Sequence, residues 1–243
     1  MAGFFNSFRI VNGELEQFDE IINGMAHSSP AAKPETHSDP TPVGPTPEEP
    51  DDPQPEYPDD PYNPLGLPPY TIRCKFAAGY TPDMGDSQTL HDEAENIWDI
   101  TKNAADWTRL FKENTQLLEV IGANTTNVTV LAGTFTNCTS LTSICLFDTQ
   151  NVTSFYSTFN ENTALRSVIP AYDLGSAENV SYMFFECFNI QGGIVDFYQR
   201  AWKNTKLRSP IAHNATLKQC GKNTSAAAEL EQIPDTWKSV RLG

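Results

Sequence analysis

The sequence predicts a repeat protein: a short solenoid of about four 24-residue units, with parallel strands on one face and α/β caps at its ends. A disordered or extended proline-rich linker is expected to precede this array. Two observations carry the prediction. Apolar residues return every 24 or 25 residues from position 103 onward, and 14 of the 18 prolines lie between Pro30 and Pro69. The first indicates stacked equivalent units, and the second separates them from the start of the chain.

Charge and composition exclude several classes of protein. The 243 residues include 16 basic and 31 acidic ones, which argues against nucleic-acid binding driven by phosphate contacts. No stretch reaches the roughly 18 to 20 apolar residues that a membrane span needs, and the first residues are not typical of a secretory signal. The five cysteines have no zinc-ligand spacing, so they are expected to be free, buried thiols. We therefore expect no cofactor, no metal, no nucleic acid and no membrane partner.

Residues 1–27 are expected to form an anchor or docking peptide. Leu15, Phe18 and Ile22 recur at helical spacing before Gly24, which predicts a short helix with one apolar stripe. An isolated helix of this length is marginal in water, so the stripe should dock on something. Docking on its own chain and anchoring to a larger assembly both remain open.

Residues 28–69 are expected to be an acidic spacer. Between Pro30 and Pro69 lie nine acidic residues and one lysine, Lys33. Frequent proline favours polyproline II over helix or sheet, and at about 3.1 Å per residue some forty residues would reach on the order of 120 Å.

Residues 70–102 are expected to cap the array with a strand and a turn. The alternation in 70–76 predicts the strand, and the next four residues its turn.

The repeat occupies residues 103–193. Its columns are Asn103, Asn127, Asn151, Ser176; Phe111, Phe135, Phe159, Phe184; Asn114, Cys138, Asn162, Cys187; Leu117, Leu141, Leu165, Ile190; and Val120, Ile144, Val168. A unit this short cannot enclose a core, but stacked copies align their apolar side chains into continuous ladders. The Asn/Cys column suits a buried turn, where Asn can hydrogen-bond to the backbone.

The spacing of Leu141, Ile144 and Leu146 matches the strand of a leucine-rich repeat, L-x-x-L-x-L. Each unit is therefore expected to give one short strand to a parallel sheet. The phenylalanine half should form the opposite wall as a short helical or irregular turn.

Two stretches carry a resemblance to a known family. Residues 127–154 read N-V-T, then G-T-F-T-N-C-T-S-L-T-S-I-C-L-F-D-T-Q-N-V-T-S, and 182–187 read Y-M-F-F-E-C. They resemble the BspA-type leucine-rich repeats of bacterial surface antigens, and the tail resembles the C-terminal cap of such arrays in virion proteins of phages of gut bacteria. The resemblance implies a leucine-rich-repeat fold displayed on a surface. The first and fourth units depart from N-V-T, as terminal repeats often do.

Residues 194–243 are expected to form a helical C-terminal cap. Its two helical stretches are predicted near 194–202 and 225–232, the second with Ser225 as N-cap and Pro234 beyond its end.

No catalytic motif is present. The four histidines lack metalloprotease spacing, and the sequence has no G-x-S-x-G, P-loop or dinucleotide fingerprint. We expect that the chain is not an enzyme.

A ligand face is predicted on the strand side of the units. Alternate side chains of stacked strands form surface columns. The candidate residues are Glu119, Ser143, Arg166, Ser167, Phe147 and Tyr172. Hydroxyls edged by aromatic rings would suit a cell-surface glycan. The alternative is that Phe147 and Tyr172 extend the core.

The functional expectation is a phage virion surface protein, a head fibre or capsid decoration, whose N-terminus anchors it and whose repeat head adheres to a host cell or glycan. The alternatives are a tail fibre or receptor-binding component, a non-phage cell-surface adhesin, and an intracellular scaffold. The expected partners are other virion proteins through residues 1–27 and a cell-surface glycan or protein. A homo-oligomer remains open, and the expected location is the virion surface.

Overall fold

The computed structural model describes residues 7–11, 14–18 and 60–240, and divides the chain into two compact units, 1–53 and 54–243. In the first unit, β1 (Ser7–Val11) pairs antiparallel with β2 (Glu14–Phe18), with Ile10 opposite Leu15. The prediction of a helix across this segment is therefore wrong for Glu14–Phe18. Asn12-Gly13 separates the strands in sequence, and Asn-Gly is the preferred dipeptide of two-residue hairpin connections. Ile22 lies outside the described residues.

The second unit, hereafter the head, begins with a four-stranded antiparallel sheet in the order β4-β5-β3-β6. Its strands are β3 (Thr71–Phe76), β4 (Ser87–Asp92), β5 (Ile97–Thr101) and β6 (Leu117–Asn124). The predicted strand from residue 70 is confirmed as β3, whose Ile72, Cys74 and Phe76 alternate into the core. Residues 70–102 hold three strands, two more than predicted.

The sequence before β3 is already part of the head. Leu67 is buried, its N–H donates to Asn63 Oδ1 (2.8 Å), and its carbonyl accepts from Asn124 Nδ2 (2.8 Å). The predicted linker boundary at residue 70 is therefore too late. The predicted linker from 28 to 59 lies outside the described residues.

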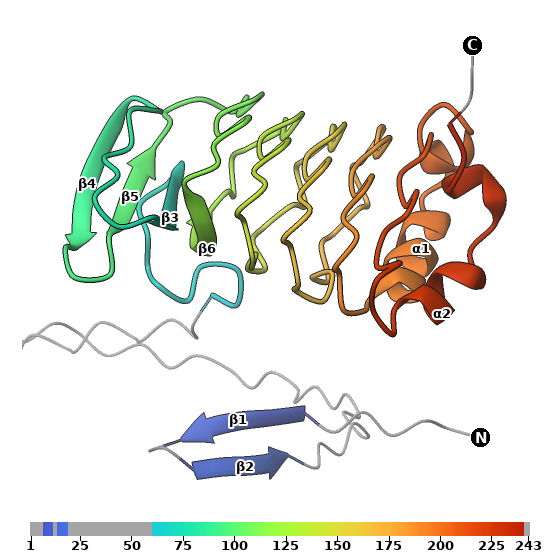
Figure 1. Ribbon diagram of the computed structural model, residues 1–243, viewed down its shortest axis with the longest axis horizontal. Helices are drawn as coiled ribbons and strands as arrows, with labels where there is room; N and C mark the ends of the chain where they lie inside the picture. Colours follow the sequence, from blue (N-terminus) through green and yellow to red (C-terminus); the bar gives the residue numbers. More distant parts are fainter. Residues whose placement is uncertain (1–6, 12–13, 19–59, 241–243) are drawn as a thin grey trace, which may run out of the picture. The chain divides into compact units, whose positions relative to one another are not determined.

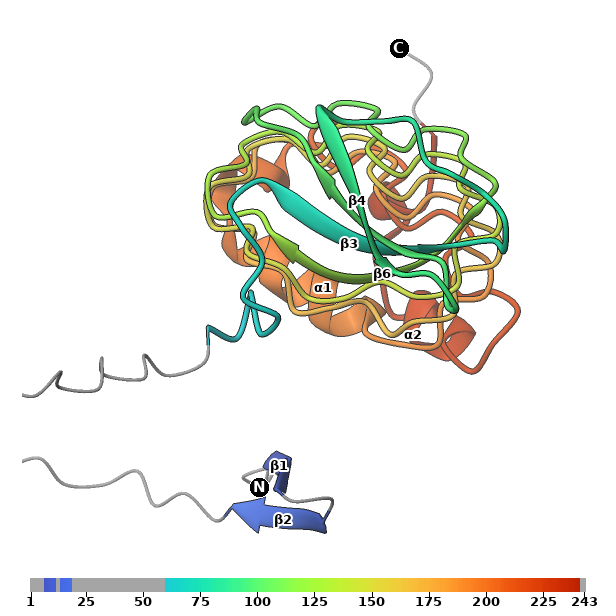
Figure 2. The ribbon, with the colours of Figure 1, turned by 90° about the vertical axis from the view of Figure 1, so that its left-hand side faces the viewer.

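Beyond the sheet, successive units of the chain lie side by side as a row of coils (Figure 1), and in Figure 2 they lie one behind another. Parallel bridges join equivalent residues of neighbouring coils, as in Asp106↔Val130, Val130↔Ser154 and Ser154↔Asn179. Within the described residues these contacts are isolated bridges rather than strands, apart from β6. The predicted short strand in every unit is thus not formed, and membership of the leucine-rich-repeat class stays a prediction.

A ladder of backbone hydrogen bonds holds the turns of the coils together; we call it the turn ladder. Each N–H donor meets an acceptor in the next coil, as in Phe111→Thr134, Phe135→Thr158, Phe159→Met183 and Phe184→Thr216, all 2.8–2.9 Å. Two left-handed residues per coil bend the backbone so that this is possible. They are Arg109 and Glu113, Gly133 and Asn137, Ser157 and Glu161, Tyr182 and Glu186, and Ala215 and Gln219, with φ from 51° to 65°.

The pairing continues into a fifth coil that the repeat search missed. Tyr182 N–H donates to Asn214 O (2.9 Å) and Glu186 N–H to Lys218 O (2.9 Å). Residues 212–219 therefore stack on the fourth unit. The segment 194–243 is not a purely helical cap.

The core contains the phenylalanine column. Phe111, Phe135, Phe159 and Phe184 are 0–1% exposed, and neighbouring rings stack with centroids 5.3 Å apart. The predicted burial of Phe135 and Phe159 is confirmed. Beside this column, a threonine in three coils donates its hydroxyl to a carbonyl of the preceding coil at 2.9 Å. These are Thr134 to Trp107, Thr158 to Leu131 and Thr216 to Val180.

The members of the Asn/Cys column differ in the hydrogen bonds that their side chains make. Asn114 Oδ1 accepts from the N–H groups of Gln116 and Leu117, and the thiols of Cys138 and Cys187 donate to carbonyls of the preceding coil. Asn162 is fully buried, yet its amide has no hydrogen-bond partner among the described residues. The expected side-chain bond to the backbone thus forms at Asn114 but not at Asn162.

The C-terminal end is closed by α1 (Ile194–Lys203), η1 (Thr205–Arg208), α2 (Ala227–Glu231) and η2 (Asp235–Trp237). The two predicted helices are confirmed, but Ser225 is not the N-cap of the second. Ala226 takes that place without a side-chain cap bond. Glu229 of α2 caps α1 instead, since its Oε2 accepts from the N–H groups of Ile194 (2.8 Å) and Val195 (3.1 Å).

Candidate functional site

The strand side of the coils brings most of the predicted ligand face together. The Glu119↔Ser143 bridge aligns the first two units, and Arg166 N–H donates to Thr142 O at 2.9 Å to add the third. Arg166 is exposed, whereas Glu119, Ser143 and Ser167 are half-buried. The Ser167 hydroxyl accepts from Ile144 N–H (2.9 Å), so it supports the stack.

The aromatic edge of this face does not exist. Phe147 is 2% exposed and Tyr172 fully buried, with ring centroids 4.8 Å apart. The Tyr172 hydroxyl donates to Cys145 O (3.0 Å), and burial raises the pKa of that phenol well above its usual value. Assigning these two residues to the ligand face was therefore wrong, because they extend the core ladder.

The predicted buried column also fails at its third member. Val120 and Ile144 are buried, but Val168 is 56% exposed, and its neighbour Ile169 is buried instead. The third unit is one residue longer than the second, so Ile169 takes the buried position of Ile144 and Val168 is exposed. The strand side therefore offers no continuous surface of equivalent side chains.

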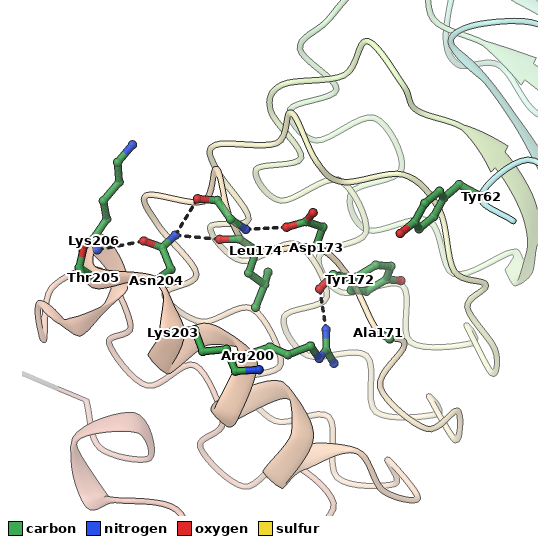
Figure 3. Close-up of a pocket in the computed structure, with 11 residues that line it drawn as sticks. Tyr62, Ala171, Tyr172, Asp173, Leu174, Arg200, Lys203, Asn204, Thr205 and Lys206 are labelled. Carbon is green, nitrogen blue, oxygen red and sulfur yellow. Dashed lines mark hydrogen bonds between the residues drawn. The ribbon is translucent and has the colours of Figure 1, made fainter. Parts of the chain in front are cut away.

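A cavity of about 680 Å³ lies between the loop at 171–175, where the third unit ends, and the end of α1 (Figure 3). Sequence reasoning did not find it, since its parts lie far apart in the chain. Its lining residues are Tyr62, Ala171, Tyr172, Asp173, Leu174, Gly175, Arg200, Lys203, Asn204, Thr205 and Lys206.

The polar groups of this cavity mainly stabilise its own walls. Arg200 donates to Tyr172 O (2.5 Å) and Pro170 O (3.2 Å) and forms an ion pair with Asp196 (2.8 Å). Asn204 Nδ2 donates to the carbonyls of Leu174 and Ala177, both at 2.7 Å. Arg200 and Asn204 thus hold the loop at 171–175 against the end of α1.

The cysteines have the environment of structural thiols. Burial raises the pKa values of Cys138, Cys145 and Cys187 to about 12, so these thiols stay protonated at neutral pH. Within the described residues, no group of three or more His, Cys, Asp or Glu side chains is placed to hold a metal ion. In the same part of the chain, no helix is long and apolar enough to cross a membrane. That the chain is not an enzyme stays a prediction.

Comparison with known proteins identifies a family. The family described as Mycoplasma protein of unknown function, DUF285, matches residues 87–219, which run from β4 through all four predicted units and into the fifth coil. No curated protein and no solved structure matches the chain. The match supports the resemblance at the level of a BspA-like surface protein family. Because it covers more than half of the sequence, the chain belongs to the DUF285 family.

Proposed function

We propose that this protein is displayed on a phage virion, as a head fibre or capsid decoration, and that its head adheres to a host cell or glycan. One observation carries the proposal: the head has its own continuous core, and in the sequence a proline-rich acidic segment lies between the hairpin β1–β2 and this core. A folded head joined in this way to a separate segment is the arrangement of a tethered binding domain.

In this proposal the N-terminal unit attaches the chain and the head does not. The hairpin β1–β2 replaces the predicted helix as the attachment element, with Leu15 and Phe18 in β2 and Ile22 beyond it. An isolated two-stranded hairpin is marginally stable in water, so it would gain stability by pairing with a larger surface. Several copies on one particle would add avidity to a weak adhesive head.

The test is a deletion of residues 1–27 in the virus that carries the protein. We expect loss of the protein from purified particles, measured by quantitative mass spectrometry, while the purified variant keeps the melting temperature of the head. Tyr156→Ala in the full chain is the control and should leave the number of copies unchanged. If the deletion left the copies per particle unchanged, attachment through residues 1–27 would be wrong. Immunogold labelling of intact particles separates a head location from a tail fibre.

A further inference from the structure

The turn side of the coils carries a small hollow around Tyr156. Its volume is about 180 Å³, and it draws on the first three units. Its lining residues are Thr108, Arg109, Lys112, Ala132, Gly133, Thr136, Tyr156 and Ser157. We propose that this hollow binds a sugar unit that carries a carboxylate, and the proposal rests on the adhesive function proposed above.

The hollow exists because two equivalent columns change side-chain size at this point. The turn ladder aligns Thr108, Ala132 and Tyr156, so a large ring follows two small side chains. In the next column Gly133 lies between Arg109 and Ser157, and all three have positive φ. A Cβ at Gly133 would lie 3.4 Å from both Arg109 Cγ and Thr136 Oγ1. The missing side chain at Gly133 therefore opens the space that the Tyr156 ring borders.

Tyr156 supplies an exposed aromatic surface with a set orientation. It is 46% exposed, and its ring meets Tyr182 edge-to-face, with centroids 5.9 Å apart and planes 73° apart. A phenol ring combines an apolar face with a polar tip, which suits a pyranose that has apolar C–H groups on one side and hydroxyls around it. Unlike the buried Tyr172, the Tyr156 ring is therefore accessible to a ligand.

Two cations make the hollow basic in a chain of net charge −15. Arg109 is exposed, and among the described residues its guanidinium has no hydrogen bond or ion pair. Lys112 pairs with Glu113 at 2.9 Å, but both side chains are largely exposed, so this pair is weak and easily exchanged. A guanidinium binds a carboxylate through two parallel hydrogen bonds, which gives an acidic sugar an advantage over a neutral one.

Hydroxyl groups line the rest of the space. Thr108 is exposed and Ser157 is half-buried. Thr136 Oγ1 donates to Ser157 O at 2.6 Å, so its oxygen can still accept a hydrogen bond. A ring face, a cation and hydroxyls of this kind match the groups of a hexuronic or sialic acid. Asp106 lies at the edge of this region, where its Oδ1 accepts from Thr108 N–H (2.7 Å), and it disfavours a second anionic group there.

The proposal is tested on the full chain by titrating 3′-sialyllactose, lactose and glucuronic acid and following ¹H–¹⁵N shifts. We expect 3′-sialyllactose or glucuronic acid to shift the amides of residues 108–112, 132–136 and 156–157, with lactose much weaker. Inorganic sulfate is the anion control, and shifts by sulfate equal to those by the sugars would mean that the hollow is only an anion site and would overturn the proposal.

Arg109→Gln should weaken binding by about 10- to 100-fold, which is the loss of one charge-assisted hydrogen-bond pair. Arg166→Gln is the matched control, an exposed arginine on the strand side, and should leave the affinity unchanged. Gly133→Asn fills the hollow with a residue that tolerates positive φ, and it should abolish binding without unfolding the head.

Equal binding by lactose, or equal weakening by both arginine variants, would overturn the assignment of this hollow. Neither result would affect virion attachment through residues 1–27, which is measured by the number of copies on particles. Unchanged copies per particle after deletion of residues 1–27, with sugar binding intact, would instead contradict the proposed attachment alone.

Discussion

The two sides of the coil stack differ in how regularly the hydrogen bonds between neighbouring coils repeat. On the turn side every interface between coils repeats the same backbone bonds, from Phe111→Thr134 to Phe184→Thr216. On the strand side the bonds change from one interface to the next: Val120 N–H reaches Ser143 O, but Ile144 N–H reaches the Ser167 hydroxyl. The regular side holds the stack together, and the irregular side tolerates an extra residue such as Val168 in the third unit.

The largest expected effect comes from breaking the regular side at its core. Phe159→Ala removes a fully buried ring that stacks on both neighbours, and it should destabilise the head by about 3 to 5 kcal/mol. Tyr156→Ala, three residues before Phe159 in the same coil, removes a half-exposed ring and should cost much less. Urea unfolding of both variants measures the difference, and similar midpoints would contradict the central role of the phenylalanine column.

A second effect of about 2 to 3 kcal/mol is expected from alkaline pH. Cys138 and Cys187 have pKa values of about 12 in the folded protein and about 9 when unfolded. Above pH 9 the unfolded chain therefore releases protons that the folded chain keeps. Stability should be unaffected by these thiols below pH 8 and fall as the pH rises from 9 towards 12.

The check is urea unfolding at pH 7 and pH 10 under reducing conditions. The double variant Cys138→Ser, Cys187→Ser should lose less stability between the two values than the native chain does, by about 1.4 kcal/mol per thiol. Tyrosines and lysines titrate in both proteins and cancel in this difference. Identical losses would show that the thiols ionise equally in both states.

A smaller effect is expected from the threonines of the turn side. Thr158→Val keeps the shape but removes the hydroxyl that donates to Leu131 O (2.9 Å), leaving that carbonyl without its side-chain donor. The expected cost is about 1 to 2 kcal/mol. Thr153→Val is the control, because its hydroxyl bond to Thr129 O (3.2 Å) is exposed to water. Equal midpoints for the two variants would count against the buried threonine hydroxyls as a source of stability.

The smallest effect is expected on the strand side. Ser143→Ala removes a half-buried hydroxyl for which the described residues show no hydrogen bond, and it should change stability by less than about 0.5 kcal/mol. Ser167→Ala removes the acceptor of Ile144 N–H and should cost about 1 kcal/mol. Thermal melting of the two variants measures the difference. A larger loss of melting temperature for Ser143→Ala than for Ser167→Ala would mean that the Ser167 hydroxyl does not stabilise the strand side.

The 24-residue period was readable because the residues that stack are the largest apolar ones. Phe111, Phe135 and Phe159 keep the same spacing, and the structure stacks their rings in that order. The fifth coil was missed because α1 and η1 lengthen the spacing from Val180 to His213 to 33 residues, while leucine replaces phenylalanine at position 217. Thr216 and Cys220 were the remaining signals, at the positions of Thr158 and the Asn/Cys column.

Site prediction failed for a different reason. Phe147 and Tyr172 share the repeat spacing. In a stacked fold, large apolar residues that recur at this spacing pack into the core and are not free to contact a ligand. The hollow at Tyr156, by contrast, is formed by residues that break the repeat pattern. Tyr156 and Gly133 each depart from the residue size of their column, and the sequence alone does not show that these departures meet in space. Similarly, Asn12-Gly13 was a hairpin signal that the helical spacing of Leu15, Phe18 and Ile22 obscured.

The paired left-handed residues of each turn have a consequence for how such a protein changes over evolutionary time. A non-glycine residue with positive φ costs roughly 1 to 2 kcal/mol, so one coil gains this shape only against a neighbour that supplies its hydrogen bonds. Inserting one residue between Ser157 and Glu161 would misplace every donor after it. Duplicating the whole stretch from 127 to 150 would add a coil with every donor matched. The head is therefore expected to differ in length among relatives by whole coils rather than by single residues.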